Sequence, residues 1–202
     1  VLPAKTGKRL PLFLDHKAII SLIMAPDTST HIGLRDRAIL EMLYSSGLRV
    51  SELVNVDMEN LNLDTMELNT RGKGNKERIV FIGQHAKSAL EVYIQHGRAH
   101  LSPKIASVGL FINRYGNRLN ARSIQKIVKS YALKSGIGQN IHPHSIRHTF
   151  ATHFIEGNAD LRSVQELLGH SSPTTTQIYT HIGQPEIRKV YLNSHPRGDK
   201  GT

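Results

Sequence analysis

The chain has 202 residues, of which 39% are hydrophobic and 21% charged, a balance typical of a soluble globular protein with one well-buried domain. It contains no cysteine and no run of about 18 apolar residues, which excludes disulfides, thiolate chemistry and a membrane-spanning helix. The 26 lysines and arginines against 16 acidic residues give a net charge of +10, which predicts a polyanionic partner, most often nucleic acid. Charge alone leaves open a basic protein without such a partner. The N-terminal stretch lacks the apolar core of a signal peptide, so we expect an intracellular protein.

The first part of the chain is expected to be helical after an extended lead-in. Pro3 and Pro11 disfavour helix within residues 1–13. Asp15 can cap a first helix, and Gly47 can end a second one in the left-handed conformation. Three helices are predicted here: residues 16–24, 31–46 and 49–55.

A β-hairpin with a strongly basic tip is predicted next. The stretches MELNT and ERIVFI favour two short strands, and RGKGNK between them is typical of a glycine-containing turn. Four basic side chains crowd this stretch with one glutamate among them: Arg71, Lys73, Lys76 and Arg78. We expect Arg71, Lys76 and Arg78 to be DNA-binding residues, because such a tip can contact a phosphate backbone.

The rest of the chain returns to helix. Asn120 and Asp160 are suitable N-caps, and a short strand is expected around Phe111. The predicted helices are residues 84–96, 120–136, 143–156, 161–168, 174–181 and 186–192. This order predicts a fold that is mainly α with a small antiparallel β-sheet (α+β), packed as one compact unit.

Several common catalytic patterns are missing from the sequence. There is no GxxxxGK[ST] phosphate loop, no cluster of aspartates and glutamates for a two-metal site, and no GxSxG elbow. A reaction at a phosphodiester would therefore depend on cationic side chains and a nucleophile from the protein.

The segment HPHSIRHTFATHF, residues 142–154, carries candidate residues for such a reaction. His144 and Arg147 lie three apart, so on a helix they share a turn and can face one small target. A guanidinium matches two phosphate oxygens, and an imidazole can move a proton near neutral pH. The alternative is that both residues are polar surface of an amphipathic helix.

A zinc site is a second alternative for the same segment. His144 and His148 have the four-residue spacing of a helical ligand pair, with His142 and His153 close by. However, Ser145 stands where the HExxH pattern has its glutamate base. We therefore expect no metal.

Four further candidates each have an ordinary explanation when considered alone. Arg49 could clamp a phosphate or simply pair with Glu52. Lys73, in the hairpin turn, could protonate a departing oxygen, contact the DNA backbone or be solvated. In the stretch GHSSPTTTQIYTH, Tyr179 follows His170 by nine residues and could be helix surface, a buried anchor or a nucleophile.

Taken together and in order, these residues resemble a known family. The blocks GLRVSEL, GKGNKERIV, HSIRHTFATH and LLGHSSPTTTQIYTH, followed by KVYLNSHPR, are similar to the signature blocks of tyrosine recombinases, the family of phage integrases. They resemble the Xer branch of site-specific recombinases most. The resemblance extends from about Leu14 to Arg197, and none of its six functional positions is substituted.

The resemblance implies a role for each of the six residues. Tyr179 would attack the scissile DNA phosphate, giving a 3′-phosphotyrosine and a free 5′-hydroxyl. Arg49 and Arg147 would clamp the non-bridging oxygens, and His144 would assist removal of the phenol proton. Lys73 would protonate the leaving oxygen, and His170 would hydrogen-bond the phosphate. No cofactor, metal or ATP is implied.

The resemblance also implies a domain organisation and partners. Residues 1–13 would be a linker, 14–183 the catalytic domain, and 184–202 a C-terminal helix and tail, either exchanged between protomers or packed on their own domain. We expect a catalytic fragment, or an unusually short relative, without the N-terminal core-binding domain of full-length members. The expected partner is a double-stranded DNA recombination site, bound by a homo- or hetero-tetramer that is monomeric in isolation. The role would be chromosome dimer resolution, with an accessory translocase, or movement of a mobile element, in the cytoplasm at the nucleoid.

Three rival functions use the same features. A DNA-binding module without chemistry would be equally basic and helical, but binding alone requires neither Tyr179 nor His170. A topoisomerase-like activity would use the same residues, so sequence does not separate it from recombination. A zinc hydrolase would lose activity to chelators.

Overall fold

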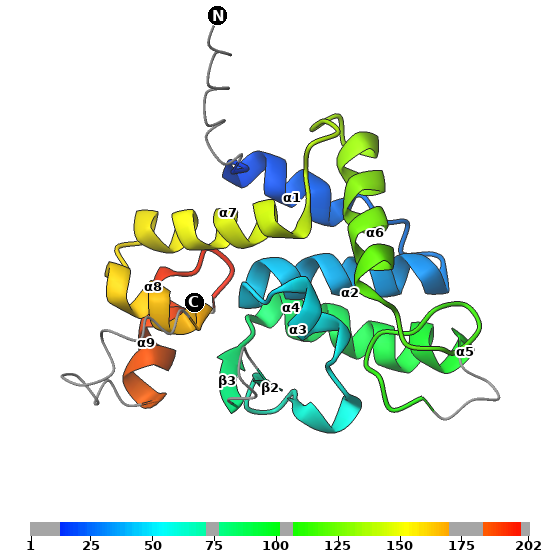
Figure 1. Cartoon of the computed structure of the whole chain (residues 1–202), viewed down its shortest axis with the longest axis horizontal. Coiled ribbons are helices and arrows are strands. Elements are labelled where there is room, and N and C mark those ends of the chain that lie inside the picture. Colours follow the sequence, from blue (N-terminus) through cyan, green and yellow to red (C-terminus); the bar gives the residue numbers. More distant parts are fainter. Residues whose placement is uncertain (1–12, 72–76, 102–106, 170–183, 199–202) are drawn as a thin grey trace, which may run out of the picture.

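The computed structural model describes residues 13–71, 77–101, 107–169 and 184–198. Helix α2 (His31–Ser46) lies at the centre, with α1 (His16–Met24), α6 (Ala121–Lys134) and α7 (Pro143–Glu156) packed around it (Figure 1). Its other neighbours are α4 (Gln84–Val92), the π-helical stretch η2 (Tyr93–Arg98) and the short α5 (Ala99–Leu101). No helix in these described ranges is long and apolar enough to cross a bilayer.

The central helix is buried almost all round. Its buried residues include the charged Arg35 and Asp36 as well as apolar side chains such as Ile39 and Leu43. Arg35 forms an ion pair with Asp36 at 2.7 Å and donates to the carbonyl of Ile112 at 3.1 Å. Pairing offsets part of the cost of burying these charges, so α2 can carry them inside the fold.

A three-stranded antiparallel sheet covers one side of this helical core. Strand β2 (Glu67–Arg71) lies between β1 (Leu61–Asn62) and β3 (Glu77–Phe81), and Leu68 faces Val80 in the register. The predicted hairpin and the fold class are therefore confirmed. The turn at 72–76 lies outside the described residues.

A second, smaller core joins β3, α7, α8 (Leu161–Leu168) and α9 (Gln184–Ser194). Phe81, Phe150, Phe154 and Tyr191 are its large buried side chains. The Tyr191 hydroxyl hydrogen-bonds Ser45 Oγ at 2.7 Å, which places α9 on its own domain. Figure 1 shows α8 and α9 together at one end of the molecule.

Three buried contacts fasten the C-terminal segment, and we call them the C-terminal latch: Tyr191 with Ser45, His195 with Tyr44, and Arg197 with Glu41. The carbonyl of Tyr44 lies 3.2 Å from Nε2 of His195, while Nδ1 of the same ring accepts from the Arg197 amide at 3.0 Å. Nη1 of Arg197 lies 3.1 Å from Oε1 of Glu41. Burial lowers the pKa of His195 to about 3, so the ring is neutral.

The predicted helices agree with the structure at their caps and differ elsewhere. Asp15, Asn120 and Asp160 accept from backbone amides as N-caps, and Gly47 has the left-handed φ of 59°. The helix expected over 84–96 instead continues through η2 to Leu101. The strand expected around Phe111 is wrong: Ile112 pairs with Arg118 in an isolated bridge only. The helix expected over 174–181 lies outside the described residues.

Candidate active site

Arg49 is placed by the sharp end of α2. An added Cβ on Gly47 would come within 2.7 Å of the Phe150 ring, so this position requires glycine for space as well as for its positive φ. The chain turns there, and Arg49 becomes the N-cap of α3 (Val50–Val54). Glu52 accepts the Arg49 backbone amide at 2.8 Å and its Nη1 at 3.0 Å. The pairing of Arg49 with Glu52 is therefore present.

Arg78 reaches the same glutamate from the hairpin. Its Nη2 lies 3.1 Å from Oε2 of Glu52, and its Nη1 donates to the carbonyl of Leu167 at 2.5 Å. The side chain is 17% exposed, and burial lowers its pKa. One guanidinium thus links strand β3 to α3 and to the end of α8.

Arg147 enters from α7 and is buried. Its Nη1 donates to the carbonyl of Gly47, and its Nη2 to that of Leu168 at 2.7 Å. The pKa of Arg147 is lowered to about 10, chiefly by burial and also by the positive charges of Arg49 and Arg78, while Glu52 acts in the opposite direction. Arg147 is therefore close enough to Arg49, Glu52 and Arg78 for their charges to shift its pKa.

We call Arg49, Glu52, Arg78 and Arg147 the arginine cluster. Arg49 and Arg78 pair with Glu52, and Arg147 lies within its electrostatic influence, so among the described members of the cluster three positive charges stand against one negative charge. Arg147 and Arg78 are stabilised by carbonyls at the C-terminal ends of α2 and α8, where helix dipoles are negative. Carbonyls satisfy hydrogen bonds without cancelling charge, so the cluster can attract an anion, and Arg49, 38% exposed, is its accessible fork.

The remaining predicted site residues stand in three positions. His144 is exposed in the first turn of α7, one turn before Arg147. Arg71 ends β2, opposite Glu77. Lys73, Lys76, His170 and Tyr179 lie outside the described residues, so their predicted roles stay predictions.

The chain leaves α8 directly beside the arginine cluster. Gly169 has a φ of 65°, and a Cβ there would lie 3.0 Å from Nε of Arg78. His170 is the next residue in the sequence. Gly169, the last described residue before 170–183, therefore lies against the guanidinium of Arg78.

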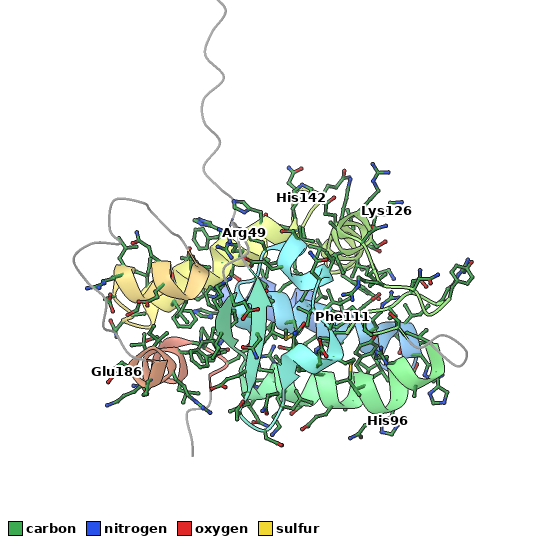
Figure 2. The ribbon with its side chains drawn as sticks, turned by 60° about the horizontal axis from the view of Figure 1, so that its bottom comes forward. Arg49, His96, Phe111, Lys126, His142 and Glu186 are labelled. Atoms are coloured by element: carbon green, nitrogen blue, oxygen red, sulfur yellow. The ribbon has the colours of Figure 1, made fainter. Side chains whose placement is uncertain are left out.

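The face that carries Arg49 also carries other basic and imidazole groups. In Figure 2, Arg49, His142 and Lys126 lie along the upper part of the molecule, and His96 and Glu186 along the lower part. Lys126 belongs to α6, and the sequence interpretation did not include it.

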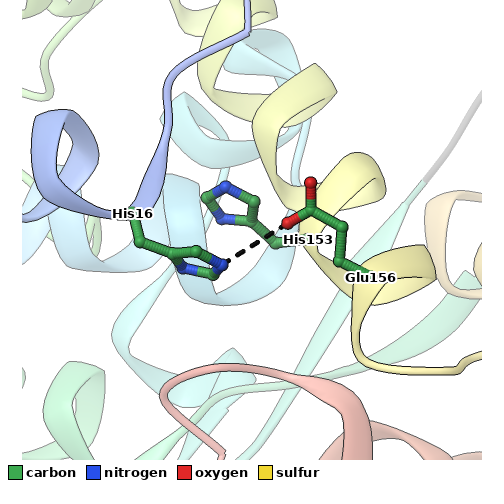
Figure 3. A group of neighbouring side chains, drawn as sticks. All are labelled: His16, His153 and Glu156. Atoms are coloured by element: carbon green, nitrogen blue, oxygen red, sulfur yellow. Dashed lines mark ion pairs between the residues drawn. The ribbon is translucent and has the colours of Figure 1, made fainter.

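Among the described residues, one group of three potential metal ligands occurs, and it is not the set that the zinc alternative named. His16 of α1 meets His153 and Glu156 of α7, with ligand atoms within 4.8 Å of one another (Figure 3). The two imidazoles are stacked, with centroids 3.8 Å apart and planes at 17°. Their in-plane lone pairs therefore run nearly parallel instead of converging on an ion, and Nδ1 of His153 already contacts the Tyr44 hydroxyl at 2.7 Å. This arrangement favours packing of α1 on α7.

Comparisons with known proteins agree with this geometry. The phage integrase family profile matches residues 12–185. Tyrosine recombinase XerD of Staphylococcus epidermidis is 45% identical over 193 residues, covering 96% of this chain and 65% of the relative. Tyrosine recombinase XerC of Haemophilus influenzae is 44% identical over 196 residues, covering 97% and 65%. The chain therefore spans just under two thirds of the length of these relatives.

Solved structures give the same result. XerA recombinase superimposes with a TM-score of 0.73 at 32% identity, covering 94% of this chain and 67% of that one. XerH site-specific recombinase bound to its difH substrate gives 0.70 at 27% identity, covering 92% and 55%. The chain belongs to the phage integrase family, whose members are tyrosine recombinases.

Proposed function

We propose that this chain is the catalytic domain of a site-specific DNA recombinase that cleaves and rejoins DNA through a covalent tyrosine intermediate. The observation that carries the proposal is the arginine cluster, which combines an exposed guanidinium with two further cations around one carboxylate. A scissile phosphate gains negative charge in the transition state, and permanent, pre-oriented cations stabilise that charge most strongly where water is partly excluded.

The proposed reaction assigns the six motif residues. Oη of Tyr179 attacks phosphorus, the bond to the 5′-oxygen breaks, and a 3′-phosphotyrosine forms. Arg49 and Arg147 hold the non-bridging oxygens. His144 assists transfer of the phenol proton to solvent, Lys73 protonates the departing 5′-oxygen, and His170 hydrogen-bonds the phosphate.

The energetics of this step favour reversal. A phenol has a pKa near 10, far below that of a sugar hydroxyl, so phenolate is the better leaving group. A 5′-hydroxyl from the same or another strand can therefore attack the phosphotyrosine and restore the DNA backbone. The phosphodiester energy stays in the covalent bond, so no ATP is required.

The biological setting proposed for the chain follows its relatives. XerH is described as bound to difH substrate in pre- and post-cleavage complexes, and we propose that this chain likewise acts on a double-stranded recombination site, in an Xer-like role. The proposed assembly is a tetramer on DNA, monomeric without it, acting at the nucleoid. Exchange of residues 184–202 between protomers would require the C-terminal latch to form with a neighbouring chain.

The test is a nicked duplex carrying a recombination site, incubated with the wild type and with Tyr179→Phe in the presence of EDTA. Loss of the short fragment next to the nick traps a covalent complex, which appears as a slow, protease-sensitive band on a denaturing gel. We expect that band for the wild type only. Cleavage by both proteins would contradict the proposed mechanism.

A further inference from the structure

Arg78 makes contacts that its expected role as a DNA ligand does not require. Its two Nη atoms are directed to partners inside the protein, Glu52 Oε2 and the Leu167 carbonyl. Its Nε is buried without a hydrogen-bond partner among the described residues and lies against Gly169. A side chain that binds a phosphate on the surface would instead leave its guanidinium N–H groups free for the phosphate oxygens.

The partners of Arg78 connect the elements that carry the proposed site. Glu52 divides its carboxylate between Arg78 and Arg49, so moving one guanidinium releases the carboxylate that orients the other. Leu167, 89 residues further along the chain, adjoins Leu168, whose carbonyl accepts from Arg147. Arg78 is therefore the residue through which β3, α3 and the end of α8 share one fixed arrangement.

We propose that Arg78 is a positioning residue of the DNA-cleavage reaction, which fixes Glu52, and through it the Arg49 fork, against the end of α8. This inference rests on the proposed function above. Its chemical logic is that a guanidinium can bond a carboxylate and a carbonyl at once in a fixed plane, and an ammonium on a flexible stem cannot reproduce that geometry. A displacement of about 1 Å in a catalytic group can reduce a rate about a hundredfold.

The experiment compares Arg78→Lys and Arg78→Gln with the charge-matched control Lys87→Gln on α4, measuring DNA affinity against salt and cleavage at saturating DNA. If Arg78 positions Arg49, both Arg78 variants cleave about 10- to 100-fold more slowly than the wild type. The salt dependence of binding of Arg78→Gln stays equal to that of Lys87→Gln, which removes the same charge, and that of Arg78→Lys stays equal to that of the wild type. Melting curves identify a variant that is not folded, and the other variant then decides.

A direct DNA contact predicts the opposite pattern and would overturn the proposal. Removing one phosphate contact lowers the slope of log affinity against log salt by about 0.9, so Arg78→Gln would show that loss. Arg78→Lys would retain both the slope and near-normal cleavage, because lysine is also a phosphate ligand.

A substrate with sulfur at the bridging 5′ position distinguishes a variant that has lost its proton donor from one in which Arg49 is misplaced. The thiolate leaves without protonation, so this substrate restores cleavage by a variant that lacks only a proton donor. We expect it to rescue Lys73→Ala and not Arg78→Lys. Rescue of Arg78→Lys would show that Arg78 acts through the proton donor Lys73 and would overturn the proposal that it acts through Arg49.

The two proposals fail differently. Absence of any covalent complex with the wild type would count against the recombinase chemistry. The salt slopes require no cleavage, and an unchanged slope for Arg78→Gln would still support an internal role, whereas a reduced slope would exclude it.

Discussion

Glu41 and Glu52 have similar arginine neighbours, but Glu41 belongs to the C-terminal latch and Glu52 to the proposed active site. Glu41 and Glu52 have side chains only 1% and 4% exposed, and each lies between two arginines. Arg37 and Arg197 enclose Glu41, with their own side chains 17% and 10% exposed.

The difference lies in what surrounds each pair. The C-terminal latch contains neutral groups in addition to the pair of Glu41 and Arg197, namely the Tyr191 hydroxyl bonded to Ser45 and the neutral His195 ring at the Tyr44 carbonyl. The arginine cluster places a third guanidinium, Arg147, beside Glu52 and leaves Arg49 accessible. The same unit of one carboxylate and two arginines therefore fastens a helix in one region and, with one more cation, prepares an anion site in the other.

The largest effect expected from this difference concerns the third cation. Arg147→Lys keeps the charge but cannot hold both the Gly47 and Leu168 carbonyls and face a phosphate, so we expect cleavage to fall about 10²- to 10³-fold. The matched variant beside Glu41, Arg37→Lys, should stay within about twofold of the wild-type rate because Arg37 lies outside the arginine cluster. Single-turnover cleavage at saturating DNA measures both, and equal losses would show that the two regions are not distinct.

Neutralising each glutamate separates stability from chemistry. Glu52→Gln and Glu41→Gln each remove the one carboxylate that two arginines share among the described residues, and we expect each to lower the free energy of unfolding by about 1–3 kcal/mol. Only Glu52→Gln should also slow cleavage, by about tenfold or more, since it releases the Arg49 fork. Urea unfolding measures the free energy of unfolding of each variant. Cleavage rates are measured at a temperature below the melting temperatures of both variants. A comparable cleavage defect in Glu41→Gln would refute it.

We expect acid to weaken the C-terminal latch, because the latch contains a buried, neutral histidine. The pKa of His195 is about 3 in the folded chain and about 6.5 when unfolded, so the unfolded chain binds more protons between these values. The stabilisation from the neutral ring is therefore complete above about pH 6.5 and declines as the pH falls, by up to about 1.4 kcal/mol per pH unit.

Urea unfolding at pH 7 and pH 5.5 measures that decline. His195→Gln should flatten the pH dependence but not remove it, because burial also lowers the pKa of His153. An identical pH dependence in the wild type and the variant would mean that His195 does not carry the effect.

The smallest effect distinguishes two left-handed glycines. Gly169 and Gly136 have φ values of 65° and 70°, so alanine at either should cost about 1 kcal/mol of backbone strain. Gly136 has open space around it, whereas a Cβ on Gly169 would meet Arg78 at 3.0 Å. Gly169→Ala should therefore also slow cleavage several-fold, and Gly136→Ala should not. Equal rates for the two variants would count against the contact between Gly169 and Arg78 having a role in the site.

Local signals in the sequence were sufficient for most of the fold. Asp15, Asn120 and Asp160 accept from amides three residues away, and Gly47 is determined by its own backbone angle, so their effects can be predicted from neighbours alone. Strand β1 has two residues and exists because Leu61 pairs with Leu68, which no local pattern indicates. The segment around Phe111 is apolar because it covers α2, and its burial was mistaken for strand propensity.

For the candidate site, the sequence motifs identified residues but not their partners. Arg49, Arg78 and Arg147 were all selected, and the pairing of Arg49 with Glu52 was named as an alternative. The burial of Arg78 and the carbonyl partners of Arg147 could not be predicted, because they depend on contacts across 89 and 100 residues of chain. Those long-range contacts decide whether an arginine faces DNA or organises other arginines.

The most direct test of the account is to identify the residue that becomes attached to DNA. The covalent complex trapped on a nicked recombination site would be digested with a protease and a nuclease, and the modified peptide sequenced by mass spectrometry. We predict a nucleotide joined through its 3′-phosphate to the peptide that contains Tyr179. A nucleotide on any other residue, or strand cleavage that persists in Tyr179→Phe, would contradict the account.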